Sequence, residues 1–366
     1  MSAFPAPGLR IALSATFAGR PVGSGAYVDA LTAALRASAP PGESLRLVQP
    51  SGSGALAKLY HEQIGFPRAA HEHACDVAHV PYWAPPLRST VPTVVTVHDL
   101  IPLLLPEYRR DPRVRAYTAL VARATRSAAM VLADSAHTAA DCVRHLGLPA
   151  DRVRVAPLGV EPRFAAAAAD PRSAARRTRL ALPQRYGLYL GGFDPRKDVA
   201  TLLAAWRTVF AASGVPLVVA GRLPEREGGL ALDPRRQAAD LGLPPGSLRF
   251  LGAIDEDDKP ALYAGAALFA FPSRYEGFGL PPLEAMAAGA PVVAADATSL
   301  PEVVGEAGRL VAPAAVAQWT EALLALLGDE AEAAARAAAG RRRAAGFTWA
   351  AAAAAVRTAY DDVAGG

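Results

Sequence analysis

The stretch RYEGFGLPPLEAMAAG, residues 274–289, places two glutamates, Glu276 and Glu284, around a Gly-Phe-Gly turn. The apolar run ALFAFPS before it predicts a buried strand. Pro281 suits the first turn of a helix, which needs no N–H from it, and Gly289 suits the helix end. The pattern predicts a strand, a flexible loop carrying Glu276, and a short helix with Glu284 in its first turns.

This loop has the composition of a ligand site. Gly277 and Gly279 let backbone amides approach a ligand closely, beside the positive end of a helix dipole. Such a loop could offer amides to a phosphate, one acid to a ribose and the other to a sugar. A Gly-Pro turn with two solvated acids explains the same residues without any ligand.

The same alternation of apolar runs and helical patterns extends through the chain. Runs that are apolar on both faces and separated by helices are typical of parallel sheets covered on both sides. Two such series predict an α/β chain of two doubly wound domains. The runs are LRIALSA, VAHV, TVVTVHD, MVLADS and VRVAPLG in the first series, and GLYLGG, PLVVAG, LRFLG, ALFAFPS and PVVAAD in the second. Helical patterns cover 25–38, 111–127, 135–146, 198–211, 255–264, 281–288, 316–327 and 347–363.

The join between the two series is expected near FAAAAADPRSAARR, residues 164–177, which is alanine-rich and has no strand pattern. An ordinary surface helix is the alternative, although the proline disfavours an uninterrupted one. The predicted domains are 1–168 and 176–345. A terminal helix within 346–366 is expected to pack back toward the first domain.

Composition narrows the class of protein. The 366 residues are 52% apolar and 20% charged, which fits a globular chain and exceeds what one hydrophobic core usually serves. IALSATFA could pass for a signal peptide, but a first buried strand fits it better. Cys75 and Cys142 match no metal or redox spacing, so we expect a cytoplasmic protein with two free thiols.

Positive charge is concentrated in the first half. Residues 1–180 hold 21 Lys and Arg against 13 Asp and Glu, whereas the remainder holds 17 against 21. This excess favours an anionic partner or an anionic membrane surface, and an arginine-rich composition is the equally weighted alternative. The densest cluster is Arg109, Arg110, Arg113 and Arg115.

Two further strand exits carry polar residues. In YLGGFDPRKDV the adjacent Arg196 and Lys197 suit a pyrophosphate, although an exposed turn is the alternative. In TVVTVHDLIP, His98 stands at the strand exit, where it could donate to a substrate hydroxyl. A structural histidine is the more common explanation for such a residue taken alone.

Two weaker motifs complete the set. RPVGSGAY places Gly23, Ser24 and Gly25 between a strand and a helix, but it matches neither known phosphate-loop pattern. The acids Asp255–Asp257 have a spacing that can hold a metal in sugar transferases. Helix capping by Asp255 is the favoured interpretation, and no metal site is predicted.

Taken in order, these stretches resemble the retaining glycosyltransferases of the GT-B fold, family 4. The resemblance is densest from FLGAIDEDDK through SLPEVVGEAGRLV, and DPRKD, VTVHDL and VRVAPLGVEPRF extend it over nearly the whole chain. It implies two Rossmann-like domains that face each other across a cleft. The first domain would be the acceptor side and the second would bind a nucleotide-sugar.

The resemblance also implies roles for the two glutamates. The position of Glu276 faces the donor sugar in this family, and that of Glu284 holds the nucleotide ribose. The positions of Phe278, Gly279 and Leu280 lend backbone amides to the phosphates and sugar.

The remaining implied roles concern the cations and the histidine. The position of Lys197 binds the pyrophosphate, and that of His98 reaches the sugar. Many members carry arginine where this chain has Gly192, so Arg196 or Arg222 would have to replace it, or the contact is weaker. The family works without a metal, so cations stabilise the departing diphosphate.

The resemblance thus implies a hexosyltransferase that acts with retention on a nucleotide-sugar such as GDP-mannose or UDP-glucose. PRKD resembles a branch often assigned to mannosyl transfer. The acceptor would be a saccharide, a lipid-linked molecule or a small-molecule hydroxyl, with no further cofactor and no nucleic acid. The expected location is cytoplasmic, with peripheral association at the inner face of an anionic membrane left open. A sugar-nucleotide 2-epimerase and a non-catalytic nucleotide-sugar-binding protein are the alternatives.

Overall fold

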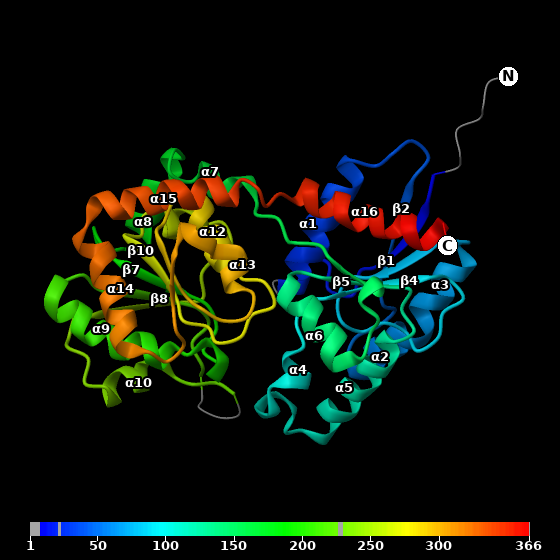
Figure 1. Ribbon diagram of the computed structural model, residues 1–366, viewed down its shortest axis with the longest axis horizontal. Coiled ribbons are helices and arrows are strands. Elements are labelled where there is room, and N and C mark those ends of the chain that lie inside the picture. Colours follow the sequence, from blue (N-terminus) through cyan, green and yellow to red (C-terminus); the bar gives the residue numbers. More distant parts are fainter. Residues whose placement is uncertain (1–7, 21–22, 226–229, 366) are drawn as a thin grey trace. The chain divides into compact units, whose positions relative to one another are not determined.

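The computed structural model describes residues 8–20, 23–225 and 230–365, which form two compact units (Figure 1). Unit 1 contains the described residues up to Gly159 together with those from Thr348 onward. Unit 2 contains the described part of Val160–Phe347. Each unit is built on one six-stranded sheet, so the predicted pair of doubly wound α/β domains is confirmed.

The sheet of unit 1 has the order β2-β1-β3-β4-β5-β6, and every neighbouring pair is parallel. The sequence predicted all of these strands except β2, which lies at the sheet edge, is only partly buried and carries Arg46. A strand that buries so little has no continuous apolar run. The strands are β1 (Arg10–Ser14), β2 (Ser44–Val48), β3 (Val77–Val80), β4 (Thr93–Val97), β5 (Met130–Ala133) and β6 (Val153–Val155).

The sheet of unit 2 has the order β12-β11-β10-β7-β8-β9 and is also parallel throughout. The sequence missed β12, which is an edge strand of three residues and too short to give a pattern. The strands are β7 (Gly187–Leu190), β8 (Leu217–Ala220), β9 (Leu248–Gly252), β10 (Leu268–Phe271), β11 (Val292–Ala295) and β12 (Arg309–Val311).

Helices connect the strands of each unit. Side-chain caps fix two of the predicted starts in unit 1, because Asp111 accepts from the amide of Arg113 and Ser135 from that of Thr138. The helices of unit 1 are α1 (Gly23–Ala37), α2 (Ala55–Tyr60), the π-helix η1 (His61–Gly65), α3 (Phe66–Glu72), α4 (Ile101–Leu104), η2 (Pro106–Arg109), α5 (Pro112–Thr125), α6 (Ala136–Leu146), η3 (Ala150–Arg152) and α16 (Trp349–Gly365). Those of unit 2 are α7 (Pro162–Ala166), α8 (Pro171–Arg179), η4 (Pro195–Lys197), α9 (Val199–Ser213), α10 (Pro234–Asp240), α11 (Lys259–Ala264), α12 (Leu280–Ala288), α13 (Leu300–Val304), η5 (Gly305–Ala307), α14 (Val316–Gly328) and α15 (Glu330–Ala344).

The terminal helix α16 is part of unit 1, where it packs along α1 (Figure 1). Its Arg357 forms an ion pair with Glu43 at 2.9 Å, and its Tyr360 hydroxyl lies 2.6 Å from Nδ1 of His79 on β3. The stretch 164–177, where the sequence analysis expected the join, contains the end of α7 and most of α8, inside unit 2.

Both sheets reverse their winding once. In unit 1 the chain runs from β1 outward to β2 and then returns to β3 on the other side of β1. In unit 2 it runs from β7 to β8 and β9, and then returns to β10 on the other side of β7. Ligands of such sheets bind in the crevice at the carboxyl ends of the two strands that flank the reversal. The crevice of unit 1 therefore lies after β1 and β3, and that of unit 2 after β7 and β10.

The core of unit 2 depends on one close approach between β7 and α9. Trp206 of α9 is fully buried, and a Cβ placed on Gly187 would lie 2.1 Å from its indole ring. Only glycine therefore fits at the start of β7 without displacing the tryptophan.

We expect Gly187→Ala to destabilise the protein by about 1–3 kcal/mol through this overpacking, measured by urea denaturation. Gly328→Ala is the control, because nothing lies within 4 Å of a Cβ built there. Equal stability of Gly187→Ala and the control would mean that the indole moves aside at no cost.

Candidate functional site

The loops after β7 and β10 meet at the crevice of unit 2, and a carboxylate joins them. Oε1 of Glu276, in the loop after β10, lies 2.5 Å from the Lys197 ammonium and 2.9 Å from the Arg196 guanidinium. Both cations belong to η4, in the loop after β7. Ser273 donates a third hydrogen bond, at 2.5 Å, to the same oxygen. The structure thus brings together three of the four predicted catalytic residues.

Charge pairing keeps this cluster ionised although it is largely buried. Burial alone would raise the pKa of Glu276, but the charges of Lys197 and Arg196 hold it below its usual value. The Lys197 ammonium also stands over the Phe271 ring, 5.0 Å from its centroid. Arg196 is also paired with Asp194 at 3.2 Å, so the two cations are balanced by two carboxylates.

A third loop, which follows β11, holds the Glu276 loop in place. The Glu276 amide donates to the Thr298 hydroxyl at 3.0 Å. The Ser299 hydroxyl donates to the carbonyl oxygens of Glu276 and Phe278 at 2.9 and 2.7 Å. The sequence analysis missed these supporting hydroxyls, which follow directly on the strand pattern PVVAAD.

The predicted amide donors lie at the start of α12. Gly279 has φ +115°, and a Cβ on it would lie 2.8 Å from a Leu300 methyl, so glycine is required there. Phe278 is buried, and its ring packs edge-on against Phe347. Leu280 begins the helix, whose N-terminus has no side-chain cap. The first turn of α12 therefore offers a positive dipole end beside a cationic cluster.

Glu284 lies further along α12 and is buried apart from Glu276. The Tyr263 hydroxyl donates to its Oε2 at 3.0 Å. Burial raises the pKa of Glu284 to about 7, although the Lys259 charge and the Tyr263 hydroxyl partly oppose the shift. Glu276 and Glu284 thus differ in charge state near neutral pH.

The two arginines considered as replacements at Gly192 have different surroundings. Arg196 is tied to Glu276 and to the Tyr275 carbonyl, at 3.0 Å. Arg222 follows the end of β8 and is exposed. The Gly192 carbonyl accepts from the Tyr189 hydroxyl, which fixes the loop without filling the crevice.

In unit 1, His98 pairs with a residue that the sequence analysis did not single out. Its Nδ1 lies 2.8 Å from the carboxylate of Asp134, which follows the neighbouring strand β5. Burial alone would lower the pKa of His98, but Asp134 and Asp99 raise it above its usual value. The sequence does contain a signal for Asp134, because this residue follows the strand pattern MVLADS and adjacent parallel strands end at the same edge of a sheet.

The predicted acceptor-side residues Gly23, Ser24 and Gly25 form the first turn of α1 rather than an open loop. A Cβ on Gly25 would lie 2.2 Å from the Arg20 carbonyl oxygen and 2.7 Å from that of Phe17. Gly25 is therefore required for close packing of α1 on the segment after β1.

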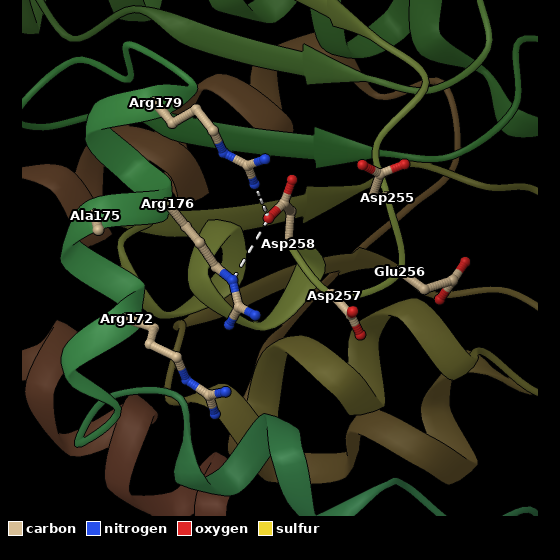
Figure 2. A pocket seen from close by; sticks show the side chains of 8 residues that line it. All are labelled: Arg172, Ala175, Arg176, Arg179, Asp255, Glu256, Asp257 and Asp258. Atoms are coloured by element: carbon tan, nitrogen blue, oxygen red, sulfur yellow. Dashed lines mark hydrogen bonds and ion pairs between the residues drawn. The ribbon is translucent and has the colours of Figure 1, made fainter.

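Four acids precede α11, and Asp258 among them points toward the arginines of α8 (Figure 2). They line a pocket of about 710 Å³ with three arginines of α8. Asp258 pairs with Arg179 and Arg176, and Asp257 pairs with Arg163. Because these acids form a turn, α11 begins at Lys259 and not at Asp255 as predicted. The pocket is lined by Arg172, Ala175, Arg176, Arg179, Asp255, Glu256, Asp257 and Asp258.

Within residues 8–20, 23–225 and 230–365, no group of three or more His, Cys, Asp or Glu side chains is arranged to hold a metal ion. None of the helices described there combines the length and the apolar character needed to cross a membrane.

The fold defined by two parallel doubly wound units is GT-B. A sucrose-phosphate synthase from Thermosynechococcus elongatus superimposes with a TM-score of 0.76 at 23% identity, covering 97% of this chain and 98% of that one. The family models "Glycosyltransferase Family 4" and "Glycosyl transferases group 1" match residues 22–164 and 184–329. The chain belongs to this family, glycosyltransferase family 4, as its sequence motifs predicted.

Two relatives are more similar in sequence. The O-antigen chain mannosyltransferase B of Escherichia coli is 36% identical over 228 residues, covering 60% of this chain and 57% of that protein. The MMP alpha-(1->4)-mannosyltransferase of Mycolicibacterium hassiacum is 31% identical over 254 residues, covering 68% and 58%. The chain therefore matches somewhat more than half the length of each relative.

The raised pKa of Glu284 predicts a pH-dependent stability. Between pH 4.5 and about 7 the unfolded chain ionises this carboxyl while the folded chain keeps it protonated. The folded state then binds more protons, so the free energy of unfolding falls as pH rises through this window. Glu284→Gln lacks this titration. Between pH 4.5 and 7, the free energy of unfolding of this variant should therefore rise by up to about 3 kcal/mol relative to that of the wild type, as measured by denaturation at the two pH values.

Tyr263→Phe is the matched variant. It removes a donor to the charged carboxylate, so the loss of stability should begin in the same range and extend to higher pH. A constant stability difference between Glu284→Gln and the wild type from pH 4.5 to 7 would contradict the raised pKa.

Proposed function

We propose that this protein transfers a hexose, with mannose favoured, from a nucleotide-sugar to a hydroxyl acceptor with retention of configuration. The proposal rests on the cluster of Lys197, Arg196 and Glu276 at the crevice of unit 2. In the sequence, Glu276 lies four residues before Leu280, where α12 begins without a side-chain cap. Mannose is favoured because both reported relatives are named as mannosyltransferases. Unit 2 is proposed to bind the donor and unit 1 the acceptor.

The cations of η4 are proposed to hold the diphosphate. Lys197 is held in place by Glu276, and Ser273 fixes that carboxylate. The Arg196 guanidinium, a group whose shape matches phosphate oxygens, is oriented by Asp194 and Glu276. As the bond from sugar C1 to the phosphate oxygen breaks, negative charge grows on the diphosphate. Preorganised cations stabilise that charge more than they stabilise the bound donor, which is what lowers the barrier.

The two glutamates are proposed to bind different parts of the donor. Glu276 is proposed to face the sugar, with its charge maintained by the two cations. Glu284 is proposed to accept from the ribose hydroxyls, and ionised Glu284 is the stronger acceptor. Because its pKa is about 7, nucleotide affinity should rise as the pH passes through neutrality. The amides of Phe278, Gly279 and Leu280 are proposed to bind the phosphates and sugar, and Arg222 to supplement the contact missing at Gly192.

On the acceptor side, His98 is proposed to contact the sugar. Asp134 fixes the ring through Nδ1, and the backbone of Pro81 also interacts with the imidazole. In the transfer step, the acceptor oxygen forms a bond to C1 on the face from which the diphosphate leaves. The acceptor proton passes to the leaving phosphate oxygen, so atoms and charge balance without a protein base.

The proposal is tested by incubating the protein with GDP-mannose or UDP-glucose, each with and without a saccharide acceptor. Acceptor-dependent release of nucleoside diphosphate supports transfer. Conversion of the donor sugar without an acceptor would instead identify an epimerase, and binding without turnover of either donor would identify a non-catalytic protein. A ligand at 100 times its dissociation constant adds about 2.7 kcal/mol of stability, so thermal shifts report which nucleotide binds.

Lys197→Met and His98→Ala should fail in different ways. Lys197→Met removes a charged contact to the diphosphate worth about 1.5–3 kcal/mol, so turnover should fall roughly ten- to a hundredfold and nucleotide binding should weaken. His98→Ala should keep nucleoside-diphosphate affinity while losing most turnover. Addition of EDTA should leave the wild type unchanged. A strict magnesium requirement with an active Lys197→Met variant would overturn this mechanism.

We further propose that unit 1 associates with anionic membranes through α2, η1 and the start of α5. Leu56, Tyr60 and Ile64 are spaced four residues apart and are 84%, 51% and 51% exposed. Tyr117 of α5 hydrogen-bonds to Glu62 of η1, so the two helices are in contact. The described arginine cluster at the start of α5 is largely exposed, and it includes Arg110, Arg113 and Arg115. Apolar and basic side chains on adjacent helices are typical of an interfacial surface.

Exchanging Arg110, Arg113 and Arg115 together for glutamine should weaken binding to vesicles rich in anionic lipid roughly a hundredfold, at about 1 kcal/mol per charge. Leu56→Ser combined with Ile64→Ser should weaken binding to the same vesicles without changing its salt dependence. Vesicle flotation measures both. Equal binding of the wild type to neutral and anionic vesicles would show that the charge excess of the first half is compositional.

A further inference from the structure

The crevice of unit 1 contains a polar and aromatic cluster that the proposed donor and His98 contacts do not use. Phe17 follows β1 and Tyr82 follows β3, and their rings meet edge-on with centroids 4.9 Å apart. The Tyr82 hydroxyl lies 2.9 Å from Oγ1 of Thr16. These residues therefore occupy the carboxyl ends of the two strands between which the winding of the sheet reverses, where doubly wound folds bind their ligands.

An irregular helix supplies the charged members of the cluster. The helices α2, η1 and α3 follow one another without a break in helical backbone, with the π-helical turn at residues 61–65. π-Helical turns are rare in proteins, and those that occur are often found at functional sites. This one carries His61, whose Nε2 lies 3.3 Å from the Ser14 hydroxyl at the end of β1, and Glu62, which is fully buried. Lys58 lies one turn before Glu62.

The Lys58 ammonium is held from several sides. It lies 5.4 Å from the ring centroid of Phe17, 5.9 Å from that of Tyr82 and 5.1 Å from that of Tyr117. One oxygen of Glu62 lies 3.5 Å from it. The lysine side chain is nevertheless 37% exposed. A cation fixed by three rings and a carboxylate has lost most of its freedom before any ligand arrives, which reduces the entropic cost of binding.

The carboxylate of this cluster is already engaged elsewhere. The Tyr117 hydroxyl lies 3.0 Å from both oxygens of Glu62. Lys58 has three N–H donors, and Glu62 is the one ion-pair partner described for it within residues 8–20, 23–225 and 230–365. The Arg20 guanidinium stands 5.8 Å from the centroid of the Phe17 ring, so a second cation flanks the ring that Lys58 contacts. Lys58 and Arg20 therefore both lie near the Phe17 ring, and the carboxylate of Glu62 is paired with Lys58.

Stability alone does not account for such an arrangement. A buried ion pair stabilises a fold no better, in general, than well-packed apolar residues of similar volume. Here the pair leaves lysine donors exposed at a ligand-binding edge and places a second cation nearby. An oxygen-rich anion is the ligand that satisfies unused ammonium donors, excess positive charge and a pre-ordered position together.

We infer that Lys58 binds an oxyanion, either a phosphate or a carboxylate, that is carried by the acceptor. Glu62 and the rings of Phe17, Tyr82 and Tyr117 hold the lysine in position. This inference rests on the proposed function in that it names the acceptor as anionic. Arg20 contributes a second positive charge near the Phe17 ring. The direct ligand of the oxyanion is Lys58, whereas Glu62 and Tyr117 are positioning residues.

The test is calorimetric titration of the full chain with the donor site saturated by whichever nucleoside diphosphate stabilises it, or without nucleotide if none does. The probes are glucose 6-phosphate, glucuronate, inorganic phosphate and neutral glucose. The wild type should bind at least one of the three anions and bind glucose at least tenfold more weakly. Preference for glucuronate or for the phosphates identifies the oxyanion, and either preference supports the inference.

Lys58→Met should lower the affinity for the preferred anion roughly ten- to a hundredfold, as expected for the loss of a charged hydrogen bond. The double variant Lys58→Met, Glu62→Gln leaves no unpaired buried charge. If the single variant does not fold, the double variant tests the same loss of anion affinity. Arg68→Met is the matched control, because Arg68 forms an i,i+4 pair with Glu72 at 2.6 Å on α3 and touches none of the rings.

Three results would overturn the inference: anion affinity unchanged in the folded double variant, equal loss in Arg68→Met, or glucose bound as tightly as the anions. The proposed transfer reaction is tested by different outcomes. Anion binding that depends on Lys58, without acceptor-dependent turnover of any nucleotide-sugar, would keep this site and reject the reaction. Turnover with anion binding that is indifferent to Lys58 would keep the reaction and reject the site.

Discussion

Parallel strands impose the constraint from which both candidate sites follow. Because every strand in each sheet runs in the same direction, all their carboxyl ends lie at one edge, and each sheet reverses its winding only once. Loops that diverge at the reversal leave a crevice that side chains must fill or a ligand must occupy. The Lys197 and Glu276 cluster stands at the reversal in unit 2, and the Lys58 and Glu62 cluster stands at the reversal in unit 1.

The two clusters share an electrostatic arrangement and differ in how firmly it is held. In unit 2 the ammonium and carboxylate are in direct contact at 2.5 Å, whereas in unit 1 they are 3.5 Å apart and the carboxylate is bound mainly by a tyrosine. In both, an aromatic ring lies beneath the ammonium. A lysine that is oriented in advance is suited to a charge brought by a ligand or formed during a reaction.

Sequence reasoning succeeded where the signal is local. The strand, turn and helix around Glu276 depend on neighbouring residues, and so do the glycine at position 279 and the helix end at Gly289. It could not find the edge strands β2 and β12, which bury too little or are too short to give a pattern. It did not pair His98 with Asp134, although both follow predicted strands, because adjacency of strands is decided by the whole fold and not by spacing along the chain.

The division of the chain has a consequence for biosynthesis. Unit 2 is one continuous segment inserted between two parts of unit 1, and the Val160 amide donates to the Phe347 carbonyl at 3.0 Å where the chain enters and leaves it. Unit 1 lacks α16, and with it the Arg357 pair to Glu43 and the Tyr360 contact to His79, until residues 349–365 emerge from the ribosome. Domains generally fold as units during synthesis, beginning with those whose residues emerge first. Unit 2 can therefore complete its core first, and a nascent chain stalled shortly before α16 would hold a finished unit 2 and an unfinished unit 1.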